Sequence, residues 1–161
     1  CEDQELDRSV GGKAAAEDAC RIAVRRLYRQ PVRTPSQCRS ARVELDRIAA
    51  GPCSRGSERR AQVKRLEKNI GERCGAAFRS TCREESHRLE LDLGAVSIEV
   101  DAPPMPGSAG SRCRPLVNRL VELEGSTGAC NRTELGRSDG AQGPVLQHFK
   151  GVADRIRGGC R

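Results

Sequence analysis

Cysteine is the residue that most limits what this chain can fold into. The chain holds nine cysteines, and one of them is residue 1. The other eight are Cys20, Cys38, Cys53, Cys74, Cys82, Cys113, Cys130 and Cys160. Eight cysteines can close into four disulfides, which predicts a small fold held together by cross-links. Disulfides persist in oxidising compartments, so we expect the protein to lie outside the cytoplasm.

The composition supports structural disulfides, because the chain is poor in large aromatic side chains. Aromatic residues make up only 2% of its 161 residues, so a core must come from Ala, Leu, Val, Ile and cystine. Such a core is thin, and each disulfide adds about 2–4 kcal/mol by restricting the unfolded chain. There is no Cys-x-x-Cys pair, and the only histidines are His87 and His148. We therefore expect no metal site and no cofactor held by side chains.

Residue 1 is the odd cysteine of the nine. A chain that starts at Cys1 and continues with a polar segment resembles a mature bacterial lipoprotein, in which a signal peptidase cuts before a cysteine that carries diacylglycerol. The resemblance covers this residue and its context. It implies lipidation of Cys1 and a place in the periplasm or at the cell surface, anchored to a bacterial membrane. The alternative is a secreted protein in which Cys1 forms a disulfide and leaves a different thiol free.

Apolar spacing divides the remaining chain into helices. Residues 1–13 are polar and contain two adjacent glycines, so we expect a flexible tether there and a single disulfide-rich helical domain over 14–161. Apolar residues at intervals of three and four predict a bundle of about five helices. These helices are expected at 14–30, from Pro35 to residue 50, from Ser57 past Cys82, from Pro115 to Gly125, and from Pro144 to Cys160.

Two short stretches depart from the helical pattern. Apolar and polar residues alternate over 87–93 and again over 96–100, on either side of a Gly-Ala pair. Period two predicts a small β-hairpin at about residues 88–101. Its polar face carries four acidic residues, namely Glu90, Asp92, Glu99 and Asp101.

One short motif recurs along the chain. Cys-Arg is followed by Leu seven residues after the Cys in four places, which start at Cys20, Cys38, Cys82 and Cys113. Seven residues are two helical turns, so the Cys and the Leu share a face. The recurrence favours an internal duplication of a cystine-bearing helix. The alternative is coincidence in a chain with 25 arginines.

The directions of the helices predict which cysteines meet. Short loops require the first three helices to run up, down and up, which brings cysteines of equal height together. The remaining four cysteines are then left for the second half of the chain. The predicted pairs are Cys20–Cys53, Cys38–Cys74, Cys82–Cys113 and Cys130–Cys160.

Charge is distributed unevenly along the chain, whose net charge is +7. Residues 18–88 carry 18 basic and 8 acidic side chains, whereas 89–111 hold four acids and no base. The basic helices and the acidic hairpin are therefore two candidate contact surfaces. Their residues are Arg25, Arg26, Arg29, Arg59, Arg60, Lys64, Lys68, Glu90, Asp92, Glu99 and Asp101. The alternative is a solvated face balanced by acids such as Glu67 and Glu72.

The motifs that the sequence lacks, together with its cysteines and charge, indicate its class of function. The chain has no recognisable nucleophile–base pair, phosphate loop or dinucleotide motif, so we do not expect an enzyme. We expect a noncatalytic cell-envelope lipoprotein that serves as an accessory or scaffold subunit of a larger membrane or surface assembly. Its partners are then the membrane, through the lipid anchor, and another envelope protein or complex. Nucleic acid is not expected, because no aromatic residues interleave with the basic ones.

Two other functions remain open from the sequence. One is a secreted binding module, such as an inhibitor or an immunity-type protein. The other is a binder of anionic glycan through the basic helices.

Overall fold

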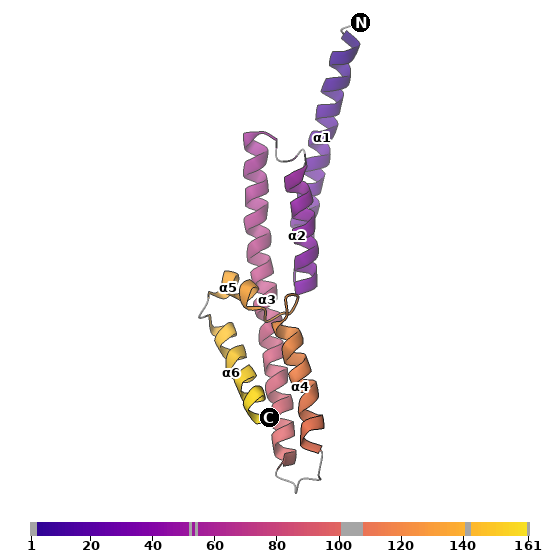
Figure 1. Ribbon diagram of the computed structural model, residues 1–161. Coiled ribbons are helices and arrows are strands. Elements are labelled where there is room, and N and C mark those ends of the chain that lie inside the picture. Colours follow the sequence, from indigo (N-terminus) through magenta and orange to yellow (C-terminus); the bar gives the residue numbers. More distant parts are fainter. Residues whose placement is uncertain (1–2, 52, 54, 101–107, 141–142, 161) are drawn as a thin grey trace. The chain divides into compact units, whose positions relative to one another are not determined.

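A computed structural model describes residues 3–51, 53, 55–100, 108–140 and 143–160, which fold into six helices without a strand (Figure 1). The helices are α1 (Asp3–Arg29), α2 (Pro35–Ala50), α3 (Ser57–Val100), α4 (Ser108–Glu124), α5 (Arg132–Asp139) and α6 (Pro144–Gly159). The prediction of a mainly helical, disulfide-cross-linked fold is confirmed.

The starts of α2 and α6 lie where the sequence predicts them. The Thr34 hydroxyl accepts a hydrogen bond from the Gln37 backbone N–H at 3.3 Å, and the Arg33 N–H donates to the Gln37 side chain at 2.8 Å. These bonds satisfy backbone donors that the first turn leaves unpaired. Pro35 and Pro144 occupy the first turns of α2 and α6, where a missing N–H costs nothing.

Two other helices begin earlier than predicted. The first, α1, begins at Asp3, so residues 3–13 belong to this helix. The second, α4, begins at Ser108 and contains Pro115 in its interior. Proline removes one backbone hydrogen bond there, but Cys113, Leu116 and Leu120 keep a continuous buried stripe on either side of it.

The predicted β-hairpin at about 88–101 is wrong, because α3 continues as a helix to Val100. Leu89 is 2% exposed, whereas Leu91, two residues later, is 62% exposed. A strand face would have placed both on the same side. Cys82, Ser86 and Leu89 are buried at intervals of four and three, which is the helical period. The short alternation therefore reflects leucines on two faces of a long helix.

The short helix α5 lies between the helices predicted to end at Gly125 and to begin at Pro144, where the sequence predicts no helix. The Asn131 carboxamide oxygen accepts hydrogen bonds from the backbone N–H groups of Thr133 and Glu134, at 3.0 and 3.2 Å. Its NH₂ group donates to the Gly125 carbonyl at 3.0 Å. Asn131 is thus the N-cap of α5, and an N-cap followed by Leu135 in the core was the available signal.

The chain divides into two compact units, Cys1–Cys74 and Gly75–Arg161, and the boundary falls inside α3. In unit 1, α1 and α2 pack with residues 57–74 of α3 (Figure 1). Arg73 on α3 donates to the carbonyls of Tyr28 and Gln30, which satisfies backbone acceptors at the end of α1. That residues 14–161 behave as a single domain stays a prediction.

In unit 2, the rest of α3 packs with α4, α5 and α6. Ion pairs join these helices: Arg119 of α4 contacts Glu85 at 2.9 Å, and Arg157 of α6 contacts Glu124. Hydrogen bonds to Glu85 and then to Glu122 raise the pKa of Arg119 above its ordinary value. Arginine stays charged at any physiological pH, so this pair is structural.

The cysteines pair in the same order within each unit: first with third and second with fourth. The pairs in unit 1 are Cys20–Cys53 and Cys38–Cys74, the two predicted from helix directions. The pairs in unit 2 are Cys82–Cys130 and Cys113–Cys160. Cα–Cα distances in the four pairs are 4.9–5.4 Å, within the range that disulfides require.

The predicted pairs Cys82–Cys113 and Cys130–Cys160 are corrected by helix geometry. Arg119 of α4 is level with Glu85 of α3, and the two helices run in opposite directions (Figure 1). At 1.5 Å per residue, Cys113 then lies roughly 13 Å along the axis from Cys82, beyond the reach of a disulfide. The turn after α4 returns the chain to Cys82 and places Cys130 beside it.

The core positions also repeat between the units. The motif Cys-Arg with Leu at seven lies on a helix in all four places, and each of its leucines is buried. Counted from the second cysteine, core residues fall at three, seven and ten; counted back from the fourth, they fall at four, eight and eleven. The matching sets are Ala41, Leu45 and Ile48 with Leu116, Leu120 and Leu123, and Val63, Leu66 and Ile70 with Phe149, Val152 and Ile156. The two units are thus one arrangement built twice, with α5 added in unit 2.

Two glycines of α3 give a matched test of helix packing. A Cβ at Gly75 would lie 2.6 Å from the Cβ of Ser138 in α5, whereas a Cβ at Gly71 meets nothing within 4 Å. We expect Gly71→Ala to stabilise the protein by up to about 1 kcal/mol, through helix propensity. Gly75→Ala should destabilise it by about 1–3 kcal/mol, because α5 must shift. Urea unfolding checks both, and equal effects would contradict the close approach.

Because the chain divides into two units, we expect the loss of one disulfide to destabilise only the unit that contains it. Replacing both Cys38 and Cys74 with Ala should lower the stability of unit 1 by about 2–4 kcal/mol, because the unfolded chain gains freedom. In hydrogen exchange, amides within residues 15–74 should lose protection, while those of α4 and α6 keep theirs. An equal loss in both units would instead indicate one cooperative domain.

Candidate binding surface on unit 1

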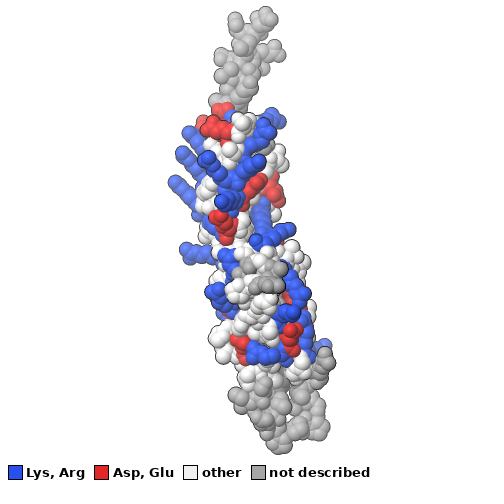
Figure 2. All heavy atoms as spheres, turned by 90° about the vertical axis from the view of Figure 1, so that its left-hand side faces the viewer, with Lys and Arg blue, Asp and Glu red and all other residues white. Residues whose placement is uncertain are grey.

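The excess of positive charge belongs to unit 1. Residues 15–74 carry 15 basic and 7 acidic side chains, whereas 75–161 carry 12 basic and 11 acidic ones. Figure 2 shows basic side chains crowded on the face that unit 1 presents, with fewer acids among them. A field of one sign on one unit favours an anionic partner there.

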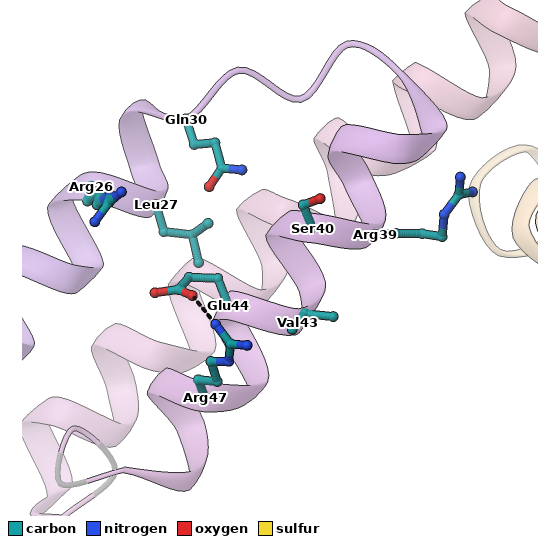
Figure 3. A pocket seen from close by; sticks show the side chains of 8 residues that line it. All are labelled: Arg26, Leu27, Gln30, Arg39, Ser40, Val43, Glu44 and Arg47. Carbon is teal, nitrogen blue, oxygen red and sulfur yellow. Dashed lines mark hydrogen bonds and ion pairs between the residues drawn. The ribbon is translucent and has the colours of Figure 1, made fainter.

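Two adjoining hollows lie on unit 1, each of roughly 700 Å³, and both are lined by Arg26 and Gln30 of α1. One, of about 730 Å³, lies between α1 and α2 (Figure 3). The other, of about 720 Å³, lies along α1. Their remaining lining residues are Leu27, Arg39, Ser40, Val43, Glu44 and Arg47 in the first, and Ile22, Arg25 and Arg29 in the second. We call the two together the arginine hollow.

The arginines of α1 in this hollow have no carboxylate partner among the described residues. Arg25, Arg26 and Arg29 are exposed, and within the described part of the chain none of them pairs with a carboxylate. Arg25 and Arg26 are adjacent, and Arg29 follows them at four and three residues, where like charges repel. Arg26 and Arg29 lie in the last turn of α1, where the helix dipole favours positive charge and offsets this repulsion. By contrast, Arg59 of α3 pairs with Glu17 of α1. The arginines of α1 are therefore exposed, have no carboxylate partner in the described residues, and are accessible to a ligand.

The hollow also holds aliphatic side chains that the core does not use. Ile22 on α1 is 64% exposed and Val43 on α2 is 51% exposed. Single exposed aliphatics are common on protein surfaces. Here, however, one lies in each part of a concave and basic surface, so a partner that covers the hollow also buries apolar area.

The half of the hollow that lies on α2 was not predicted from the sequence. Arg39, Val43 and Arg47 are spaced by four, so they share one face, which differs from the buried stripe of that helix. Arg47 makes an ion pair with Glu44 at 3.4 Å. The spacing was visible in the sequence, but only the pairing of α1 with α2 brings it beside the arginines of α1.

The predicted basic residues of α3 lie apart from this hollow. Arg60 donates to the Gly56 carbonyl of its own first turn at 3.4 Å, and Lys64 and Lys68 are exposed. Together with Arg59, these residues line neither part of the arginine hollow. The basic residues predicted on α3 therefore take no part in the arginine hollow.

The predicted acidic residues lie on α3 instead of a hairpin. Asp92 is exposed, while Glu90 is half-buried and contacts Arg155 and His148 of α6, the latter at 3.4 Å. His87 approaches Glu90 at 3.9 Å. The side chain of Glu99 and the whole of Asp101 lie outside the described residues. Glu90 thus joins α3 to α6, which is a structural role, and both histidines of the chain surround it.

The described part of the chain offers no free thiol and no group of side chains placed to bind a metal ion. The eight internal cysteines are all in disulfides, and no three His, Cys, Asp or Glu side chains are placed to hold a metal ion. Among these residues, no helix combines the length and the apolar character needed to cross a membrane. Cys1 lies outside them, so its lipidation stays a prediction.

The repeated arrangement supplies an internal comparison for the hollow. Counted from the first and second cysteines of each unit, Ile22, Arg25, Arg29, Val43 and Arg47 correspond to Glu84, His87, Leu91, Asn118 and Glu122. These five surface positions differ between the units, whereas Arg26 and Arg39 correspond to Arg88 and Arg114. The complete set of basic and aliphatic side chains that lines the hollow is therefore found in unit 1 and is only partly repeated in unit 2.

No protein family, curated protein or solved structure matches this chain.

The arrangement separates arginines that support the fold from arginines that do not. We expect Arg26→Gln or Arg29→Gln to change the free energy of unfolding by less than about 0.5 kcal/mol, because each side chain is exposed and unpaired. Arg73→Gln should cost about 1–3 kcal/mol, because carbonyls at the end of α1 lose a charged donor. Thermal and urea unfolding measure both. A large loss at Arg26 would assign the hollow to folding.

Proposed function

We propose that the protein is a noncatalytic binding module that acts outside the cytoplasm, as an accessory or scaffold subunit of a larger membrane or surface assembly. The observation that carries this proposal is the arginine hollow: a surface of unit 1 with exposed aliphatic side chains and with three arginines of α1 that pair with no carboxylate in the described residues. Residues of this kind contribute little to folding and fit a partner's surface.

The disulfides support a place outside the cytoplasm. Four pairs within 161 residues would be reduced in a cytosolic environment, whereas oxidising compartments preserve them. The proposed compartment is the periplasm or the cell surface of a bacterium.

The cysteine pairs bear on the proposed lipid anchor. Because the eight internal cysteines pair among themselves, Cys1 is the one cysteine without a place in these pairs. A lipid on Cys1 would hold the basic unit near the membrane, and thus near envelope proteins. Anchoring by several acyl chains is stable, unlike anchoring by a single chain.

Two measurements on native, membrane-extracted protein test this function. The intact mass should exceed that of the polypeptide with four disulfides by a lipid, and detergent pull-down should recover a stoichiometric protein partner. A bare mass with a recovered partner would favour the secreted binding module. A lone, lipid-free monomer would contradict the proposal.

A further inference from the structure

We propose that the arginine hollow binds an acidic amphipathic helix of a partner protein. The inference rests on the proposed function and names the chemistry of the partner. It follows from three properties of the hollow: its charge, its exposed aliphatic side chains and its length.

The charge of the hollow calls for several carboxylates. Of the arginines that line it, Arg47 pairs with Glu44, the one acid among the lining residues, whereas Arg25, Arg26 and Arg29 pair with no carboxylate in the described part of the chain. A guanidinium group presents paired N–H donors that match the two oxygens of a carboxylate. Arg25 and Arg29 stand one helical turn apart, which suits Glu or Asp side chains repeated at the same interval on a partner.

The aliphatic side chains call for an apolar stripe beside those carboxylates. Ile22 stands one turn before Arg26 on α1, and Val43 stands midway between Arg39 and Arg47 on α2. A Leu or Val on the partner that covers either one removes exposed apolar area from water. A sulfated or uronic glycan offers no such group, so these residues favour a peptide.

The dimensions of the hollow suit a short helix. Ile22 to Arg29 spans two turns of α1, about 11 Å, and the adjoining hollow deepens the surface toward α2 (Figure 3). A helix laid in a groove between two helices uses anchors spaced by three and four residues. An anionic membrane is flat and fits the hollow between α1 and α2 poorly.

The test uses the full-length protein with its disulfides formed and a designed peptide of two heptads (~14 residues), with Glu and Leu along one helical face. Fluorescence anisotropy of the labelled peptide gives the affinity, which should fall as salt rises. The comparison peptide has Gln in place of every Glu. Vesicles of anionic phospholipid and a sulfated glycan are the competing ligands.

Two triple variants change the charge of unit 1 equally. R25Q/R26Q/R29Q removes three arginines of the hollow, and R60Q/K64Q/K68Q removes three exposed charges of α3. We expect the first to weaken peptide binding roughly tenfold to a hundredfold, and the second to leave it nearly unchanged. The pair I22S and V43S should also weaken binding, with little change in its salt dependence. Circular dichroism verifies that each variant remains folded.

Several outcomes overturn the inference. Equal losses in the two triple variants would mean that net charge alone acts. Equal affinity for the Gln peptide, or retention on vesicles or glycan without peptide binding, would exclude the acidic helix. A native partner that R25Q/R26Q/R29Q still recovers in full would refute this site and leave the proposed function standing.

Discussion

Each unit depends on two disulfides that join alternate cysteines. One ties the first helix to the segment after the second helix, and the other ties the second helix to the last, at Cys74 within α3 in unit 1 and at Cys160 after α6 in unit 2. Interleaved cross-links of this kind fix all three helices at once, since no helix can leave without breaking a covalent loop. They matter most in unit 1, whose core contains aliphatic side chains and cystine but no buried aromatic residue among those described. Unit 2 adds Phe78 and Phe149 to the same plan.

The long helix α3 belongs to both arrangements, as the last helix of unit 1 and the first of unit 2. Its two roles require different neighbours along its length. Arg73 reaches the end of α1, whereas Gly75, two residues later, lets α5 approach at Ser138. Arg79 then donates to the Ser138 carbonyl and satisfies an acceptor in the last turn of α5. A change of partner thus occurs within about one turn, and a glycine with no Cβ makes it sterically feasible.

The sequence predicts what depends on local spacing and fails where the answer depends on distant contacts. Helical stripes, the caps of α2 and α6, and the pairs Cys20–Cys53 and Cys38–Cys74 follow from periodicity and short loops. The hairpin was wrong because a few alternating residues cannot be told from a helix until the burial of Leu89 and the exposure of Leu91 are known. The predicted cysteine pairs of unit 2 were also wrong, because the correct pairs depend on the full length of α3, which the predicted hairpin had shortened. Only the part of the arginine hollow on α1 was predicted from the sequence. The part on α2 also has regularly spaced arginines, but only the packing of α1 against α2 brings the two sets together.

The cross-links also explain how unit 1 tolerates its charge. Residues 15–74 carry fifteen basic and seven acidic side chains, and the excess of positive charge produces repulsion in the folded state. Disulfides act chiefly on the unfolded chain, so their contribution does not depend on what the surface carries. A thin core alone would have to balance this repulsion with better packing or with ion pairs, and ion pairs would neutralise the arginines. Stability supplied by disulfides is therefore compatible with Arg25, Arg26 and Arg29 having no carboxylate partner among the described residues, and arginines in that state are accessible to a ligand.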